Sequence, residues 1–159
     1  MALQTPLSWL QDFVELSMAP DALAERLTTA GLEVELIEKI GENWGEYCVV
    51  GQVTEIRKHP NADTLNLVDV DFGADKPITI VTGAPNIQEI AENFSEPAPK
   101  VALALTGAML VDAYHDDHPL KKLKPATIRG IASEGMLCSE LELGLSEEHE
   151  GILILPEDA

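Results

Sequence analysis

A chain of 159 residues, 45% of them hydrophobic, allows one ordinary domain or two small ones with a buried core. Aromatic residues make up only 4%, so this core must be built from Val, Leu, Ile and Ala. No apolar run is long enough for a membrane span, and the N-terminus lacks the pattern of a secretory signal. The two cysteines form no CxxC pair and suit a reducing, cytoplasmic environment.

The chain is strongly acidic, with 28 acidic residues against 10 basic ones and a formal net charge of −18. Taken whole, this charge argues against nucleic-acid binding, because affinity for phosphate comes from Lys and Arg. The distribution is uneven, since eight of the ten cations lie in residues 51–131 and none lies in 132–159. Any nucleic-acid site is therefore expected in the central part of the chain.

The first 40 residues predict two short helices and a strand. Pro6 stands at the start of the first helix and Pro20 at the start of the second, where a missing N–H costs nothing. Gly31 ends the second helix. Residues 32–40 then alternate apolar and charged side chains, which is typical of a half-buried strand.

After Cys48 the pattern changes to short strands separated by turn residues. The predicted strands lie near 48–57, 65–72, 77–82, 100–106 and 122–129, with a last apolar run at 152–155. Inside 65–72 the apolar residues change parity, which indicates a bulge or a strand that turns a barrel corner. Residues 86–99 and 112–119 are predicted to be exposed loops. Five short strands with little helix between them favour a small barrel or sandwich.

Several stretches carry motifs in a definite order. They are PLSWL at 6–10 and AGLEVE at 30–35, VGQV at 50–53 leading to HPNAD at 59–63, VTGAPN at 81–86, and IRGIASEGMLCS at 128–139. In order and spacing they resemble the bacterial phenylalanyl-tRNA synthetase β chain. HPNAD and SEGM also occur in free-standing tRNA-binding proteins and in appended domains of other synthetases, so these two identify only the module. The opening helices and the MLCS continuation identify the β chain.

The resemblance implies a mainly β fold with some α: a five-stranded OB-fold barrel over residues 41–150. Before it stands a segment of two helices and one strand, residues 1–40. By the family's layout that segment is part of an interrupted αβ domain, to which residues 151–159 return.

The implied function is tRNA binding during ATP-dependent attachment of phenylalanine to its tRNA. The family enzyme is a cytoplasmic α2β2 heterotetramer, so the implied partners are the phenylalanine-specific tRNA and the α subunit, with no membrane or DNA. ATP and magnesium belong to the parent enzyme. Its aminoacylation and editing centres lie outside this N-terminal part, which is expected to hold no cofactor and no metal and to be non-catalytic.

The expected RNA-binding residues fall in two stretches of the sequence. They are Arg57, Lys58, His59 and Asn61 in the first, and Lys121, Lys122, Lys124, Arg129, Ser133 and Met136 in the second. In a closed barrel the first and last strands can be neighbours, so these cations are expected to share one face. Each has a plainer interpretation as well. Lysines protect strand edges, Asn suits the 59–63 turn, and Ser133 resembles a helix N-cap with Met136 at helical spacing.

Two other functions stay open at this stage. The acidic charge fits an OB-fold scaffold that braces the synthetase with little RNA contact, and the module motifs fit a free-standing tRNA-binding protein. The HDDH stretch at 115–118 holds metal-ligand residue types, but it lies in a predicted loop that mixes hard and borderline ligands, so no metal site is expected.

Overall fold

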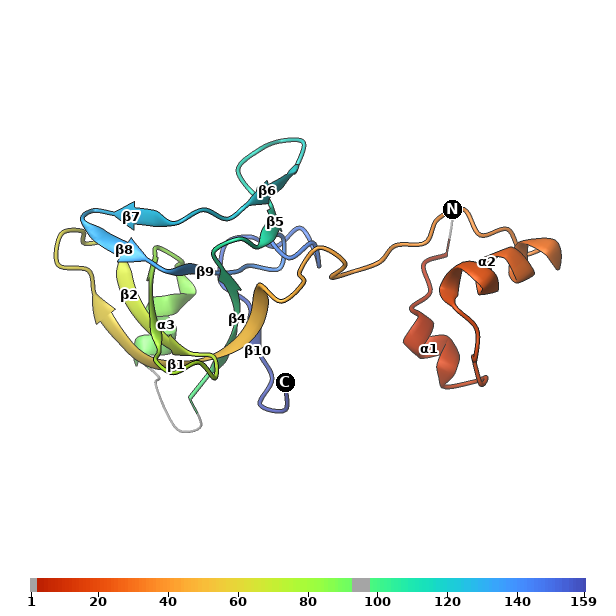
Figure 1. Cartoon of the computed structure of the whole chain (residues 1–159), viewed down its shortest axis with the longest axis horizontal. Helices are drawn as coiled ribbons and strands as arrows, with labels where there is room; N and C mark the ends of the chain where they lie inside the picture. The colour runs from red at the N-terminus through yellow and green to blue at the C-terminus, as the bar shows by residue number, and fades with distance from the viewer. Residues whose placement is uncertain (1–2, 93–97) are drawn as a thin grey trace. The chain divides into compact units, whose positions relative to one another are not determined.

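The computed structural model describes residues 3–92 and 98–159 and divides the chain into two compact units, Met1–Lys39 and Ile40–Ala159 (Figure 1). Each unit is described by itself. No described helix has both the length and the apolar character that a membrane span requires.

The N-terminal unit holds helix α1 (Leu7–Gln11) and helix α2 (Pro20–Thr29). Pro20 occupies the first turn of α2, and Gly31 follows the helix with φ +95°, as predicted. The predicted strand at 32–40 is wrong: residues 32–39 form no regular structure, and Leu32 and Leu36 are 65% and 70% exposed. The alternation is present, but none of the described strands pairs with this segment, and a lone strand has no ladder partners.

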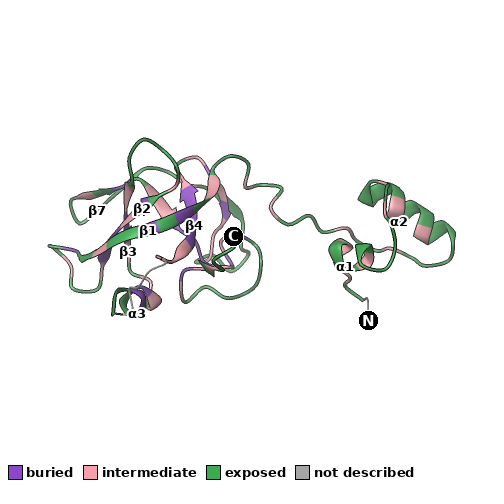
Figure 2. Ribbon diagram, turned by 90° about the horizontal axis from the view of Figure 1, so that it is seen from below, coloured by how far each residue is buried: buried purple, intermediate pink, exposed green. Residues whose placement is uncertain are grey.

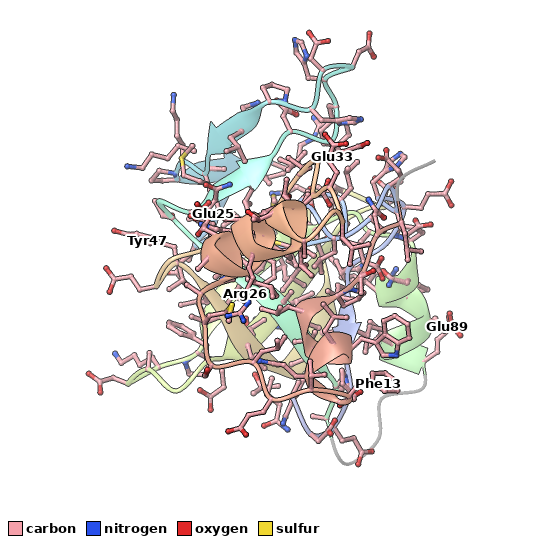
Figure 3. The ribbon with its side chains drawn as sticks, turned by 90° about the vertical axis from the view of Figure 1, so that its right-hand side faces the viewer. Phe13, Glu25, Arg26, Glu33, Tyr47 and Glu89 are labelled. Carbon is pink, nitrogen blue, oxygen red and sulfur yellow. The ribbon has the colours of Figure 1, made fainter. Side chains whose placement is uncertain are left out.

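None of the described residues of this unit is buried, from residue 3 to residue 39. Phe13 is 72% exposed, and on α2 Glu25 and Arg26 are also exposed (Figure 3).

The second unit is built around five antiparallel strands. They are β1 (Cys48–Lys58), β2 (Asn66–Asp71), β3 (Ile78–Thr82), β4 (Lys100–Leu105) and β9 (Gly135–Leu137). Strand β1 pairs with β2 and β4, β2 pairs with β3, and β4 pairs with β9. The row of strands nearly closes on itself, because Glu134, just before β9, donates its N–H to the carbonyl of Thr79 on β3 at 3.1 Å. This nearly closed barrel is the expected OB fold.

Strand β1 pairs with two other strands, β4 and β2, because it bends. Its first residues, up to Gln52, pair with β4, and from Gln52 onward it pairs with β2. The register slips between Val53 and Glu55, which marks a bulge and lets one strand turn the barrel corner. The corner predicted from the parity of 65–72 therefore exists, but the irregularity lies in β1, opposite Val70. At Gly51 an added Cβ would lie 2.4 Å from Val70 Cγ1, so the barrel interior requires glycine there.

The main core is aliphatic and lies inside the barrel. In Figure 2 the buried parts of the barrel strands are coloured purple. Its fully buried members include Val53, Val68, Ile80 and Leu103. Helix α3 (Asn86–Glu92) adds Ile87 and Ile90 to the same core. This helix replaces the first half of the loop predicted for 86–99, while residues 93–97 lie outside the described part of the chain.

Two hairpins follow β4 and lie along the top of the barrel unit in Figure 1. They are β5 (Met109–Val111) with β6 (Leu120–Lys122), and β7 (Ala126–Ile128) with β8 (Ile131–Ser133). The predicted single strand at 122–129 is therefore wrong. It is divided between the two hairpins around Pro125, whose missing N–H cannot support a continuous ladder. The last barrel strand is β9 instead.

Residues 151–159 fall in the unit Ile40–Ala159, and their return to an interrupted first domain stays a prediction. Ile152 is part of the main core, and β10 (Ile154–Leu155) pairs with β4. Asn86, the last residue of VTGAPN, both donates to and accepts from the Ile152 backbone, at 2.9 and 3.0 Å. The end of the described chain is thus held by the barrel.

Candidate nucleic-acid interface

The β7–β8 hairpin ends in a two-residue turn, Arg129-Gly130, closed by the pair Ile128 and Ile131. Both turn residues have positive φ, +49° and +91°, the sign pattern of the type I′ turn that suits a two-residue hairpin. Glycine and asparagine are the usual residues in such a turn. Arg129 is instead a long charged side chain, exposed, on a backbone that L residues rarely adopt.

The turn after β1 lies against this hairpin (Figure 1). His59 is only 4% exposed, and its Nε2 lies 3.2 Å from the carbonyl oxygen of Ile128. The Asn61 Nδ2 donates to the carbonyl oxygen of Arg129 at 3.2 Å. Residues nearly seventy positions apart therefore form one surface, which contains predicted site residues from both stretches of the sequence.

The cations at the end of β1 differ in their surroundings. Arg57 forms ion pairs with Asp69 and, at 3.5 Å, with Glu55. Lys58 donates from Nζ to the amide oxygen of Gln88 on α3, at 2.6 Å. The amide is neutral, so Lys58 keeps its positive charge available, whereas the charge of Arg57 is compensated within the protein.

The lysines of the second stretch do not line one strand with Arg129. Lys121 and Lys122 lie on β6, in a separate two-stranded sheet, and Lys124 lies between the hairpins. Lys121 Nζ is 2.9 Å from Asp112 Oδ2. This contact, with the Tyr114 backbone N–H, lowers the pKa of the Asp112 carboxyl. Lys122 and Lys124 are exposed, and no carboxylate partner is recorded for either among the described residues.

Ser133 and Met136 are not at the start of a helix, so the predicted N-cap is wrong. Ser133 ends β8, is 6% exposed, accepts from the Val81 N–H at 3.0 Å and donates to the Gly135 carbonyl at 2.9 Å. Met136 lies half-buried on β9, paired with Ala104. The SEGM motif thus lies where β3 meets β8 and β9. Ser133 bonds to β3 there, whereas Met136 packs against a second buried cluster that includes Ala104 and Leu110.

The described residues contain no group of three His, Cys, Asp or Glu side chains that could hold a metal ion. Both cysteines are free. Burial raises the pKa of the Cys138 thiol, and to a lesser degree that of Cys48, so both are neutral thiols at pH 7.

Residues 48–107, from β1 to just past β4, match the family described as "Putative tRNA binding domain". The whole chain is 47% identical over 157 residues to the phenylalanine–tRNA ligase β subunit of Dehalococcoides mccartyi strain 195, covering 99% of this chain. Over nearly its full length the chain is homologous to phenylalanine–tRNA ligase β subunits. Those of Burkholderia lata and Synechococcus elongatus are each 45% identical, over 98% and 96% of this chain. The resemblance stated from the sequence motifs is confirmed.

The chain spans 18% of the length of the Dehalococcoides β subunit and 17% of that of Synechococcus elongatus. A solved structure, the C-terminal domain of Plasmodium vivax p43, is 23% identical with a TM-score of 0.37, covering 57% of this chain and 44% of that one. That likeness is too slight to bear on function. The match to the β subunits includes the opening helices as well as the barrel, which disfavours the free-standing tRNA-binding protein.

Proposed function

We propose that this chain is the tRNA-binding region of a phenylalanine–tRNA ligase β subunit. Its contact surface is formed by the 59–65 turn and the β7–β8 hairpin, with Lys58 and Arg129 as the principal cations. The observation that carries this proposal is the joining of these two segments by hydrogen bonds from His59 and Asn61. They bring Arg129, which is exposed and has no carboxylate partner among the described residues, next to the end of β1.

Charge compensation separates the candidate cations into two groups. Arg57 and Lys121 have carboxylate partners, so binding a phosphate there gains little, because the carboxylate must be displaced or repelled. Lys58 and Arg129, with Lys122 and Lys124 further along the chain, have no carboxylate partner recorded among the described residues. Only the cations of this second group are expected to contribute their full charge to RNA binding, by displacing counterions from the phosphates.

The outer face of the barrel strands is poorly suited to reading bases. Strands β1, β2 and β3 contain no aromatic residue on which a base could stack. Asp69 on β2 is engaged by Arg57 and by the Thr79 hydroxyl, the latter at 2.7 Å, and Glu134 accepts from the Thr79 N–H at 3.2 Å. The proposed contact is therefore to the RNA backbone, and its affinity is weak and strongly dependent on salt.

In the whole enzyme, on this proposal, the chain supplies one tRNA contact while phenylalanine attachment takes place elsewhere. The parent uses ATP and magnesium, pairs the β subunit with an α subunit in an α2β2 assembly, and works in the cytoplasm. The 159 residues by themselves are non-catalytic and carry no cofactor. Mixing the chain with ATP, phenylalanine and tRNA tests this last point, since any aminoacylation above the no-protein control contradicts it.

Binding of fluorescent tRNA at about 20 and 150 mM salt tests the RNA contact. Arg129→Gln is expected to weaken binding at low salt and to reduce the salt slope by about one. Arg57→Gln is the matched control, because it removes an equal charge that is already compensated, and it should leave the slope nearly unchanged. The double change Lys122→Glu/Lys124→Glu shows whether the surface extends toward β6.

The competing function is an acidic scaffold that braces the assembled enzyme. The net charge of −18 and the compensation of Arg57 by two carboxylates favour it. It requires that wild-type chain fail to bind tRNA even at low salt, a result that contradicts our proposal. Equal losses in Arg129→Gln and Arg57→Gln would instead contradict the assignment of the surface.

A further inference from the structure

The His59 ring uses its two nitrogens in different ways. Nδ1 accepts a hydrogen bond from the Asn61 backbone N–H at 3.1 Å, so Nδ1 carries no proton. Nε2 then carries the proton and donates it to the Ile128 carbonyl, 3.2 Å away. The neutral ring with its proton on Nε2 is thus the form that satisfies both contacts. It links the 59–65 turn to the β7–β8 hairpin.

The two contacts from the turn fall on either side of one residue. The Ile128 carbonyl, held by His59, belongs to the peptide plane that precedes the Arg129 Cα. The Arg129 carbonyl, held by the Asn61 side chain, belongs to the plane that follows it. Fixing both planes fixes φ and ψ of Arg129, and φ is +49°, a value that a non-glycine residue keeps only when its surroundings impose it.

We propose that His59 and Asn61 are positioning residues, which hold the backbone of Arg129 so that its guanidinium faces an RNA phosphate. This rests on the proposed function and deepens it. The sequence suggested that His59 and Asn61 touch RNA themselves. The structure supports a different role, because the His59 ring is buried and both its nitrogens are engaged within the protein, as is the Asn61 amide nitrogen.

Two near-isosteric changes separate the two contacts of His59. In His59→Gln the amide nitrogen takes the place of Nε2, so the donor to Ile128 remains. In His59→Asn the amide oxygen takes the place of Nδ1, so the acceptor for the Asn61 N–H remains and the tie to the hairpin is lost. Asn61→Ala removes the second tie from an exposed position, where a folding failure is not expected.

The binding assay at low salt measures these variants in the full 159-residue chain, with circular dichroism confirming that each is folded. Arg129→Gln is expected to weaken tRNA binding by roughly tenfold, the scale of one charged hydrogen bond. His59→Asn and Asn61→Ala should approach that loss, while His59→Gln should stay within about twofold of wild type. The double variant His59→Asn/Arg129→Gln should bind no more weakly than Arg129→Gln alone, because His59 acts through Arg129.

An additive double variant overturns the positioning role, and so does an Arg129→Gln variant that binds like wild type. A second readout is independent of RNA. In the NMR spectrum, nitrogen shifts should show His59 protonated on Nε2, and His59→Asn should move the Ile128, Arg129 and Gly130 resonances more than His59→Gln does. If the wild-type chain binds no tRNA, the proposed function fails. The NMR spectrum then tests by itself whether His59 holds the Arg129 backbone. Unmoved hairpin resonances overturn it.

Discussion

The N-terminal unit and the barrel follow the same rules of periodicity but differ in what they bury. In the barrel, Val53, Val68 and Ile80 are fully buried. In the N-terminal unit, Trp9 is 53% exposed, and its ring packs edge-to-face on Phe13, with centroids 5.6 Å apart. Local pattern is enough to form a helix, whereas burial requires strands that meet from distant parts of the chain. The stability of this protein is therefore concentrated in the barrel.

The largest effect should come from the barrel core. Leu103→Ala removes a side chain that is 1% exposed and should lower the free energy of unfolding by about 3 kcal/mol. Phe13→Ala should change the barrel's unfolding by less than about 0.5 kcal/mol, as an exposed substitution usually does. Trp44 lies in the barrel unit, where its Nε1 donates to the Leu143 carbonyl at 3.1 Å. Denaturant unfolding followed by Trp44 fluorescence, in a Trp9→Phe background, measures both changes. Comparable losses from the two changes would break the contrast between the units.

The next effect tests the seam that closes the barrel. Ser133→Ala leaves the buried Val81 N–H without its partner and should cost about 2 kcal/mol. Ser146→Ala is the matched control, because that hydroxyl contacts Glu140 in an exposed loop and its loss should cost little. Thermal and denaturant unfolding compare the two. A small loss in Ser133→Ala would mean that the β3 seam contributes little to the fold.

A smaller effect, of opposite sign, is expected at the hairpin turn. Arg129→Asn places a residue that tolerates positive φ in an Asn-Gly turn, and should stabilise the fold by about 0.5–1 kcal/mol while weakening tRNA binding. Arg129→Gln loses the same charge without relieving the backbone, so it should weaken binding with no gain in stability. Equal stability of the two variants would show that the Arg129 backbone is unstrained.

The smallest expected effect is on the pH dependence of stability at the β5–β6 hairpin, which forms a sheet separate from the barrel. The folded pKa of Asp112 lies below its unfolded value, chiefly because of the Lys121 hydrogen bond. The resulting stabilisation is present above the unfolded pKa and is lost as pH falls through the lowered folded pKa. Titration followed by carboxyl NMR should show a midpoint below the ordinary Asp value, and Lys121→Gln should raise it. A midpoint that the variant leaves unchanged would rule out the ion pair in solution.

The strands differ in how well their sequences predicted them. The first four barrel strands were predicted within a residue or two, because period-two alternation and the turns between them are local signals. Helix α3 was missed, since its polar residues around Ile87 and Ile90 resemble a loop. The strand at 122–129 was wrong because Pro125 separates two hairpins whose partners lie elsewhere in the chain.

The candidate site was predicted only as a set of residues. Arg129 was identified by its charge and by the motif around it, and His59 by its place in HPNAD. Their relation was not visible, because the contact between His59 and Ile128 spans 69 positions. Nor could the sequence distinguish Arg57 from Arg129, since compensation of Arg57 depends on Asp69, which β-strand pairing places opposite Glu55, two residues before Arg57.

The resemblance to phenylalanine–tRNA ligase β subunits, the aliphatic barrel and the gathering of cations in the central part of the chain could all be predicted from the sequence. These follow from residue types and their spacing, which are local properties. The pairing of strands in three dimensions sets which cations have a carboxylate partner and which polar side chains hold the barrel and its hairpins together. It also leaves Arg129 exposed, with no carboxylate partner among the described residues. Those properties depend on which atoms lie within a few ångströms of one another, and that depends on how strands distant in sequence are paired.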